Sequence, residues 1–85
     1  MPDVVMYSTR FCPYCVRARM LLESKKVPYT DIRIDEQPDR RAEMEQRAQR
    51  TSVPQIFIDN EHIGGCDDLF ALEARGELDR KLGLE

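Results

Sequence analysis

The chain has 85 residues, of which 41% are hydrophobic and 34% charged, and its formal net charge is −3. This length suits one small domain with a modest core, expected over residues 1–85, and the acidic balance argues against nucleic-acid binding, which needs a basic surface. No stretch approaches the ~18 apolar residues of a membrane span, so we expect no membrane partner.

The first predicted element is a short strand over residues 4–7, whose apolar strand formers suit a strand covered on both faces. A helix begins at Pro13, because proline at the first helical position gives up only an N–H that has no partner. Val16 and Met20 form a second, narrower apolar stripe on this helix, so we expect it to be covered over much of its perimeter. Pro28 ends the helix, since the residue before a proline resists helical geometry.

Residues 29–34 alternate as a second strand. The next helix is mostly polar, begins with Pro38 at its first position, and buries little beyond Ala42, Met44 and Ala48. A third strand over residues 54–59 follows.

Asp59 and Asn60 are turn residues, and residues 61–63 return as the hairpin partner of the third strand. Residues 64–68 lead into the last helix, around Leu69, Phe70 and Leu72, and Gly76 is its natural C-cap. The order β-α-β-α-β-β-α starts with a parallel unit and ends with an antiparallel hairpin. It predicts an α/β fold with one four-stranded mixed sheet and helices on both faces.

The three cysteines, Cys12, Cys15 and Cys66, are the candidates for chemistry. The amino terminus has no basic region and its apolar run is too short for a signal peptide, so we expect a cytoplasmic protein. In that compartment thiols stay reduced, and an odd number of cysteines argues against a disulfide scaffold. This favours catalysis or metal binding.

Cys12 is expected at the junction between the first strand and the first helix. Only a thiolate attacks disulfides, and unpaired N–H groups and the positive dipole end of a helix N-terminus stabilise an anion there. Cys15, one turn on, is at the ~5–6 Å Cα separation that a disulfide needs, and it faces the buried side. The pattern therefore predicts that Cys12 attacks and that Cys15 resolves.

Two alternatives stay open for this pair: chance packing in a helix, or half of a zinc site. Structural zinc takes four ligands and often a second Cys or His pair, whereas only Cys66 and His62 remain here. A Cys-x-x-Cys that follows a strand in a β-α-β pattern favours a thioredoxin-like redox dithiol, with no metal.

With Cys-Pro-Tyr-Cys (12–15) at this junction, the chain resembles a glutaredoxin of the small dithiol bacterial type over essentially its whole length. TSVPQIFID (51–59) resembles the T-x-V-P segment of that family, and GGCDD (64–68) resembles its glutathione-binding turn. Thioredoxins are less similar, because their dithiol is Cys-Gly-Pro-Cys after a tryptophan, and here Phe11 precedes the pair. The resemblance implies a thioredoxin-like fold and a glutathione-dependent thiol–disulfide oxidoreductase.

The resemblance also implies roles for single residues. Cys12 is the nucleophile that takes up glutathione as a mixed disulfide, and Cys15 is the resolving thiol. Tyr14 flanks the glutathione, Val53 pairs its backbone with the tripeptide as an added strand does, and Pro54 is cis.

Further glutathione contacts are implied at matching motif positions. Cys66 and Asp67 hold the γ-glutamyl carboxylate, which agrees with the attraction of helix N-termini for anions. Thr9, Thr51 and Gly65 belong to the same binding set.

One position departs from the family pattern. The family usually has a lysine three residues before the nucleophile, and this chain has Thr9 there. We expect the adjacent Arg10 to take over the contact with the glycine carboxylate of glutathione.

Other reactive residue types have ordinary interpretations. Cys66 is expected to pack at the binding turn rather than act as a third redox thiol, and His62 to be a solvated histidine. The arginines of the polar segment are expected to form a solvated face, with a role in docking acidic partners or glutathione as the alternative; they are Arg40, Arg41, Arg47 and Arg50.

The expected partners are glutathione as reductant and glutathionylated or disulfide-bonded proteins, with ribonucleotide reductase as a candidate, and the expected state is a monomer. Two other functions stay open. One is a carrier of a glutathione-ligated iron–sulfur cluster, which the proline after Cys12 disfavours. The other is a thioredoxin-like hydrogen donor reduced by a flavoprotein reductase.

Overall fold

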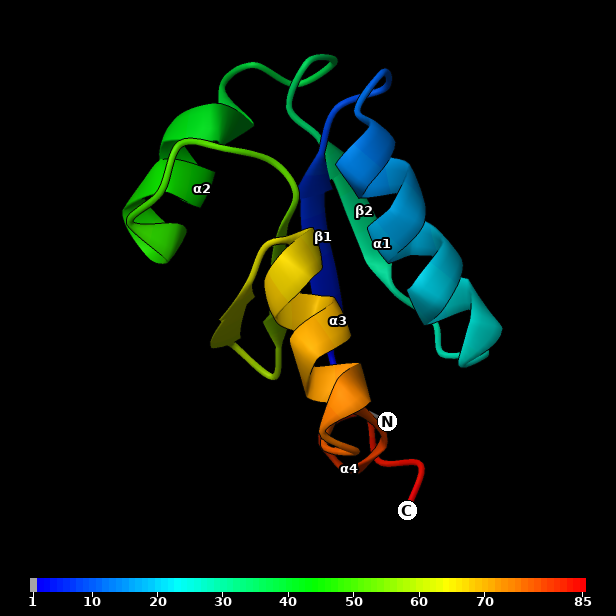
Figure 1. Ribbon diagram of the computed structural model, residues 1–85. Helices are drawn as coiled ribbons and strands as arrows, with labels where there is room; N and C mark the ends of the chain where they lie inside the picture. The colour runs from blue at the N-terminus through cyan, green and yellow to red at the C-terminus, as the bar shows by residue number, and fades with distance from the viewer. Residues whose placement is uncertain (1) are drawn as a thin grey trace.

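The computed structural model describes residues 2–85, so Met1 of the predicted domain lies outside the described residues. The elements follow the predicted order (Figure 1). The strands are β1 (Val4–Ser8), β2 (Thr30–Arg33), β3 (Gln55–Ile58) and β4 (Glu61–Gly64). The helices are α1 (Pro13–Ser24), α2 (Arg40–Ala48), α3 (Cys66–Ala74) and the single turn α4 (Leu78–Lys81). Among residues 2–85, none of the helices combines the length and apolar character needed to cross a bilayer.

The strands form one mixed sheet in the order β2-β1-β3-β4, which confirms the predicted architecture. β1 is central: it pairs in parallel with β2 and antiparallel with β3, and β3 pairs antiparallel with β4. Tyr7 of β1 lies opposite Ile32 on one side and Gln55 on the other. Because β1 is an inner strand, the chain leaves the middle of the sheet and continues into the N-terminus of α1.

Helices cover both faces of the sheet, with α1 and α3 on one face and α2 on the other (Figure 1). Met6 packs among the residues of α1 and α3, and Leu22 and Leu69 belong to the same core. Tyr7, the residue after Met6 in β1, packs with Met44 of α2 on the opposite face of the sheet. Successive side chains of a strand point to opposite faces, so β1 is buried on both, as its apolar run predicts.

The coverage predicted for α1 is wrong. Only one side of the helix is packed, through Cys15, Ala18 and Leu22, whereas Val16 and Met20 are 43% and 64% exposed. Their spacing matches a helical stripe, but no element of residues 2–85 packs over them.

Two predicted helix boundaries also shift, and one residue expected to be buried is exposed. α1 ends before Pro28 is reached, because Lys26 has a left-handed φ of 59°. α2 begins at Arg40 rather than at Pro38, since the N–H groups of Glu36 and Gln37 both bond to the Arg33 carbonyl and form a turn first. Ala42 of this helix is exposed, while the burial predicted for Met44 and Ala48 is confirmed.

Candidate active site

Cys12 is the N-cap of α1, in the loop that leaves the central strand. Its backbone is extended, and its Sγ accepts a hydrogen bond from the Cys15 N–H at 3.2 Å. The sulfur thus takes the place of the hydroxyl or carboxylate that usually caps a helix. A helix N-terminus and a direct N–H donor both stabilise negative charge on such a group. The side chain is half-buried, so a disulfide can reach it from solvent.

Cys15 has the opposite environment one turn further on. It is fully buried, and burial, followed by its hydrogen bond with Cys12, raises the pKa of Cys15 to about 12. A backbone hydrogen bond from Thr9 and the charge of Arg19 act against this rise. At neutral pH Cys15 is therefore a protonated, buried thiol, whereas the Cys12 side chain is partly exposed to solvent. This agrees with the predicted division between an attacking and a resolving cysteine.

Arg19 is held in place behind Cys15 by β1 and β2. Its guanidinium lies 3.1 Å from Asp31 and 3.4 Å from the Ser8 hydroxyl. Ser8, which is fully buried, donates to Asp31 at 2.5 Å. Because Cys15 and Arg19 are four residues apart on α1, they share one face of the helix. The network places a fixed positive charge one turn below the buried thiol.

The segment before β3 lies across from Cys12. The Val53–Pro54 peptide bond is cis, as the resemblance implies. The Cys12 thiol donates to the Val53 carbonyl over 3.8 Å. Val53 therefore stands beside the reacting sulfur through its backbone.

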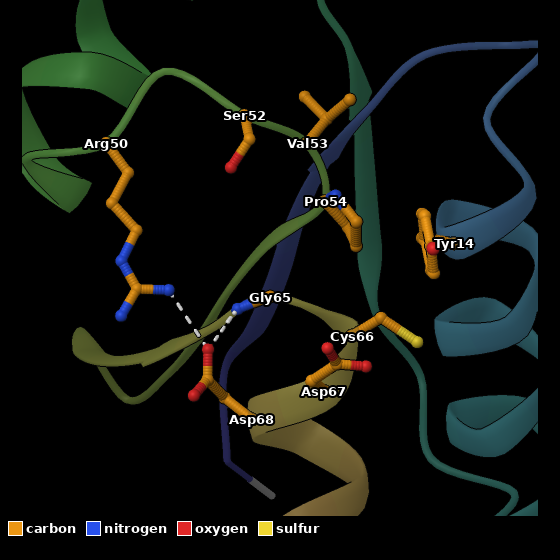
Figure 2. Close-up of a pocket in the computed structure, with 9 residues that line it drawn as sticks. All are labelled: Tyr14, Arg50, Ser52, Val53, Pro54, Gly65, Cys66, Asp67 and Asp68. Carbon is orange, nitrogen blue, oxygen red and sulfur yellow. Dashed lines mark hydrogen bonds and ion pairs between the residues drawn. The ribbon is translucent and has the colours of Figure 1, made fainter.

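A pocket of about 270 Å³ opens next to this pair (Figure 2). Its walls come from α1, the segment before β3 and the N-terminus of α3. The lining residues are Tyr14, Arg50, Ser52, Val53, Pro54, Gly65, Cys66, Asp67 and Asp68. Among residues 2–85, no three His, Cys, Asp or Glu side chains gather where they could hold a metal ion.

Comparison with known proteins places this site in a family. The sequence model named Glutaredoxin matches residues 4–63. The chain belongs to the glutaredoxin family. It is 56% identical to Glutaredoxin 3 of Escherichia coli K12 (93% of this chain, 95% of the relative) and 52% identical to the glutaredoxin of Pseudomonas aeruginosa (96% and 98%).

Solved glutaredoxin structures share the fold. A buckwheat glutaredoxin–glutathione complex superposes with a TM-score of 0.90 at 30% identity, over 96% of this chain and 77% of that one. The thioredoxin-like fold and the activity implied by the resemblance are thereby confirmed. The chain is a glutathione-dependent thiol–disulfide oxidoreductase.

Most of the residues predicted to contact glutathione meet at the glutaredoxin pocket. The ones that line it are Tyr14, Val53, Pro54, Gly65, Cys66 and Asp67. Thr9, Arg10 and Thr51 are not part of the lining. The Arg10 guanidinium pairs with Glu36 at 3.4 Å, and the Thr51 carbonyl accepts a hydrogen bond from Arg41. Their roles toward glutathione stay predictions.

Arg50, Ser52 and Asp68 also line the pocket. Arg50 was expected on a solvated face, with docking of glutathione as the alternative, whereas Ser52 and Asp68 were not singled out. Asp68 accepts the Gly65 N–H at 2.9 Å and pairs with Arg50 at 3.0 Å, and these two interactions, in that order, lower the pKa of Asp68. The spacing of Gly65 and Asp68 fits a capping box and would have identified Asp68. Arg50 is distant from Asp68 in the sequence, and only the tertiary structure brings the two side chains together.

Gly64 lets this turn form. Its φ is +118°, and a Cβ at this position would lie 2.2 Å from the Asp68 carboxylate. A side chain is excluded both by conformation and by space. Glycine is thus needed at position 64 because Asp68, which caps α3, occupies the space of a side chain there. This need does not depend on a ligand.

Two of the ordinary interpretations need correction. His62 is half-buried rather than solvated: its Nε2 lies 2.7 Å from the Gln55 side-chain carbonyl, and burial lowers the pKa of His62. Arg47 is not a purely solvated side chain, because its guanidinium lies 4.1 Å from the Phe57 ring centre and donates to the Tyr7 hydroxyl at 2.7 Å.

The packing role expected for Cys66 agrees with the structure. Its side chain is 4% exposed and belongs to the core between α1 and α3. Burial raises the pKa of Cys66, which keeps it a thiol at neutral pH.

Proposed function

We propose that glutathione binds in the pocket beside Cys12 and exchanges there with disulfides of protein substrates. The proposal is supported most by one observation: the Cys12 sulfur caps α1 within reach of the Val53 carbonyl, at the edge of this pocket. The solved complex of the buckwheat relative contains glutathione.

The pocket offers the tripeptide two kinds of contact. The backbone of Val53 is able to pair with the extended tripeptide, as an edge strand does. The free N–H groups at the start of α3, those of Cys66 and Asp67, suit the γ-glutamyl carboxylate. Arg50 lies at the side of the pocket away from Tyr14, where its guanidinium pairs with Asp68 at 3.0 Å (Figure 2).

The first reaction is exchange at one thiol. The Cys12 thiolate attacks the glutathionyl sulfur of a mixed disulfide, the substrate's sulfur leaves as a thiolate, and Cys12 is left bonded to glutathione. A second glutathione thiolate attacks that glutathionyl sulfur, releases oxidised glutathione and restores the Cys12 thiolate. The net reaction consumes one free glutathione: the substrate sulfur is released as a thiol, and the glutathionyl group removed from it leaves in oxidised glutathione.

The second reaction uses both cysteines. Cys12 attacks a protein disulfide and forms an intermolecular bridge, which Cys15 breaks by attacking the Cys12 sulfur. Cys15 loses its proton in this step and the substrate leaves as a dithiol. Two glutathiones then reduce the Cys12–Cys15 disulfide.

The biological setting is part of the proposal. Because the cycle consumes glutathione, it suits the cytoplasm, where a glutathione pool keeps thiols reduced. The protein substrates are glutathionylated or disulfide-bonded proteins, with ribonucleotide reductase as a candidate, and the working unit is a monomer whose pocket is built from one chain.

Glutathione-dependent reduction of a small mixed disulfide tests the proposal. The native chain should turn over, Cys12→Ser should be inactive, and Cys15→Ser should stay active because the first reaction needs one thiol. Activity that survives in Cys12→Ser would refute the assignment of the nucleophile.

A further inference from the structure

Large apolar side chains are exposed along α1 and the loop before it. Phe11, Tyr14, Val16 and Met20 are 88%, 55%, 43% and 64% exposed. Among residues 2–85, only one other large apolar side chain, Leu84, is exposed. Four of these five exposed side chains thus lie on α1 or in the loop before it, the segment that carries the catalytic sulfur. A cluster of this kind marks an interaction surface more often than a scattered set does.

A groove between α1 and α3 continues this surface. It has a volume of about 330 Å³ and is lined by Arg17, Met20, Leu21 and Phe70. Arg17 follows Tyr14 by three residues and Phe70 follows Cys66 by four, so each lies one turn further along the helix that forms a wall of the glutathione pocket. The two helices run side by side on the same face of the sheet (Figure 1). The groove therefore extends the pocket away from Cys12.

Arg17 gives this groove a charge. Its guanidinium lies 5.5 Å from the centre of the Phe70 ring. Within residues 2–85 no carboxylate is paired with it, whereas Arg19, two positions on, is bound to Asp31. An unpaired cation beside an apolar floor is complementary to an acidic residue next to a large apolar one.

We propose that the groove between α1 and α3, lined by Arg17, Met20, Leu21 and Phe70, receives the polypeptide of a protein substrate beside its disulfide-bonded cysteine. One large apolar side chain of the substrate packs against Met20 and Phe70, and one Asp or Glu pairs with Arg17. The inference rests on the proposed function, because the substrate sulfur has to reach Cys12 while its chain runs along the groove.

Glutathionylated peptides test this docking surface. One peptide carries Leu and Glu near its cysteine, a second has Ser in place of Leu, and a third has Lys in place of Glu. The quantity measured is kcat/KM for glutathione-dependent reduction, beside that for a small mixed disulfide without a peptide. For the native chain we expect the Leu/Glu peptide to exceed the Ser peptide about tenfold and the Lys peptide about threefold.

Met20→Gln isolates the apolar contact. Met20 is exposed and outside the pocket, so turnover of the small mixed disulfide should be unchanged while the preference for Leu over Ser falls to about twofold. Leu84→Gln, at an exposed apolar residue away from the groove, is the matched control and should keep the full preference. An equal loss by Met20→Gln on all substrates, or no loss on any, would overturn the inference.

Arg17→Glu isolates the charge. The ratio of kcat/KM for the Glu and Lys peptides should reverse in this variant, and any effect of the charge on Cys12 cancels in the ratio. The ratio should approach unity as salt is raised, because exposed pairs are screened.

An unchanged ratio in Arg17→Glu would contradict the inference. A dimer in solution that Met20→Gln dissociates would also contradict it, since a second copy would then cover the groove. A native chain that reduces no mixed disulfide would instead refute the proposed function.

Discussion

The two cysteines of the active site lie one helical turn apart in regions with opposite properties. Around Cys12 the chain is open: the sulfur is half-buried, an N–H group bonds to it, and a pocket lies beside it. Around Cys15 the chain is closed: the thiol has no exposure, and a network of Arg19, Asp31 and Ser8 lies behind it. The difference shows how one motif contains both an attacking and a resolving cysteine. Solvent access and hydrogen bonding distinguish the two, since the residue type is the same.

Removal of the resolving cysteine, Cys15, should have the largest effect and should distinguish the roles of the two regions. Cys15→Ser should abolish reduction of protein disulfides, because the bridge on Cys12 has no resolving thiol, and should retain reduction of glutathionylated substrates. An insulin-type disulfide assay beside the mixed-disulfide assay measures both. If both activities survived in Cys15→Ser, the closed region would have no part in the reaction.

Arg19→Gln should slow the step that Cys15 carries out. Once Cys12 is in a disulfide it no longer raises the pKa of Cys15, and burial is then opposed by Arg19 and the Thr9 backbone. Without the charge, fewer Cys15 thiols ionise, and resolution at pH 7 should be about threefold slower, because the Arg19 charge is the weakest of these influences. Because deprotonation favours attack, the deficit should shrink as pH rises.

Stopped-flow measurement of resolution, with Cys12 preloaded as a mixed disulfide, gives this pH profile. Arg33→Gln is the control, since Arg33 also contacts Asp31, at 3.5 Å, without acting on Cys15. Equal rates for Arg19→Gln and the native chain at every pH would exclude the role of Arg19.

On the open side, Gly64→Ala tests the turn that carries the pocket. Its left-handed φ and the Asp68 carboxylate should make the substitution cost about 2 kcal/mol of unfolding free energy. Gly76→Ala is the control: Gly76 is also left-handed, at φ 73°, but nothing lies within 4 Å of its Cβ position, so it should cost less. Urea unfolding measures both, and equal costs would mean that the contact with Asp68 is unimportant.

Asp68→Ala should have the smallest effect. It removes the cap of α3 and the partner of Arg50, so we expect a loss of about 1 kcal/mol of unfolding free energy and a higher KM for glutathione at unchanged kcat. Asp68→Asn keeps an acceptor for the Gly65 N–H and should recover the stability. A lower kcat with unchanged KM would place Asp68 in the chemical step instead.

Much of this site follows from local sequence. The N-cap position of Cys12 follows from a strand, a break and Pro13, and the burial of Cys15 follows from helical periodicity. The binding turn follows from its glycines and the acid three residues later. These features depend on neighbours in the chain, where geometry is nearly fixed.

The remainder depends on contacts between distant segments. Arg50 reaches Asp68 only because the segment after α2 returns beside α3, and His62 finds Gln55 across the register of β3 and β4. The stripe of Val16 and Met20 shows a different limit. Periodicity identifies an apolar face but does not tell whether the same chain or a partner covers it.

The central claim is that Cys12 is the accessible and reactive sulfur of the folded chain, while Cys15 and Cys66 are buried and protected. Alkylation of the reduced, folded chain with iodoacetamide at pH 7, followed by peptide mass spectrometry, tests it directly. The account predicts rapid modification of Cys12 alone, with Cys15 and Cys66 labelled only after unfolding. Labelling of Cys15 before Cys12, or a folded chain in which Cys12 resists the reagent until strongly alkaline pH, would contradict it.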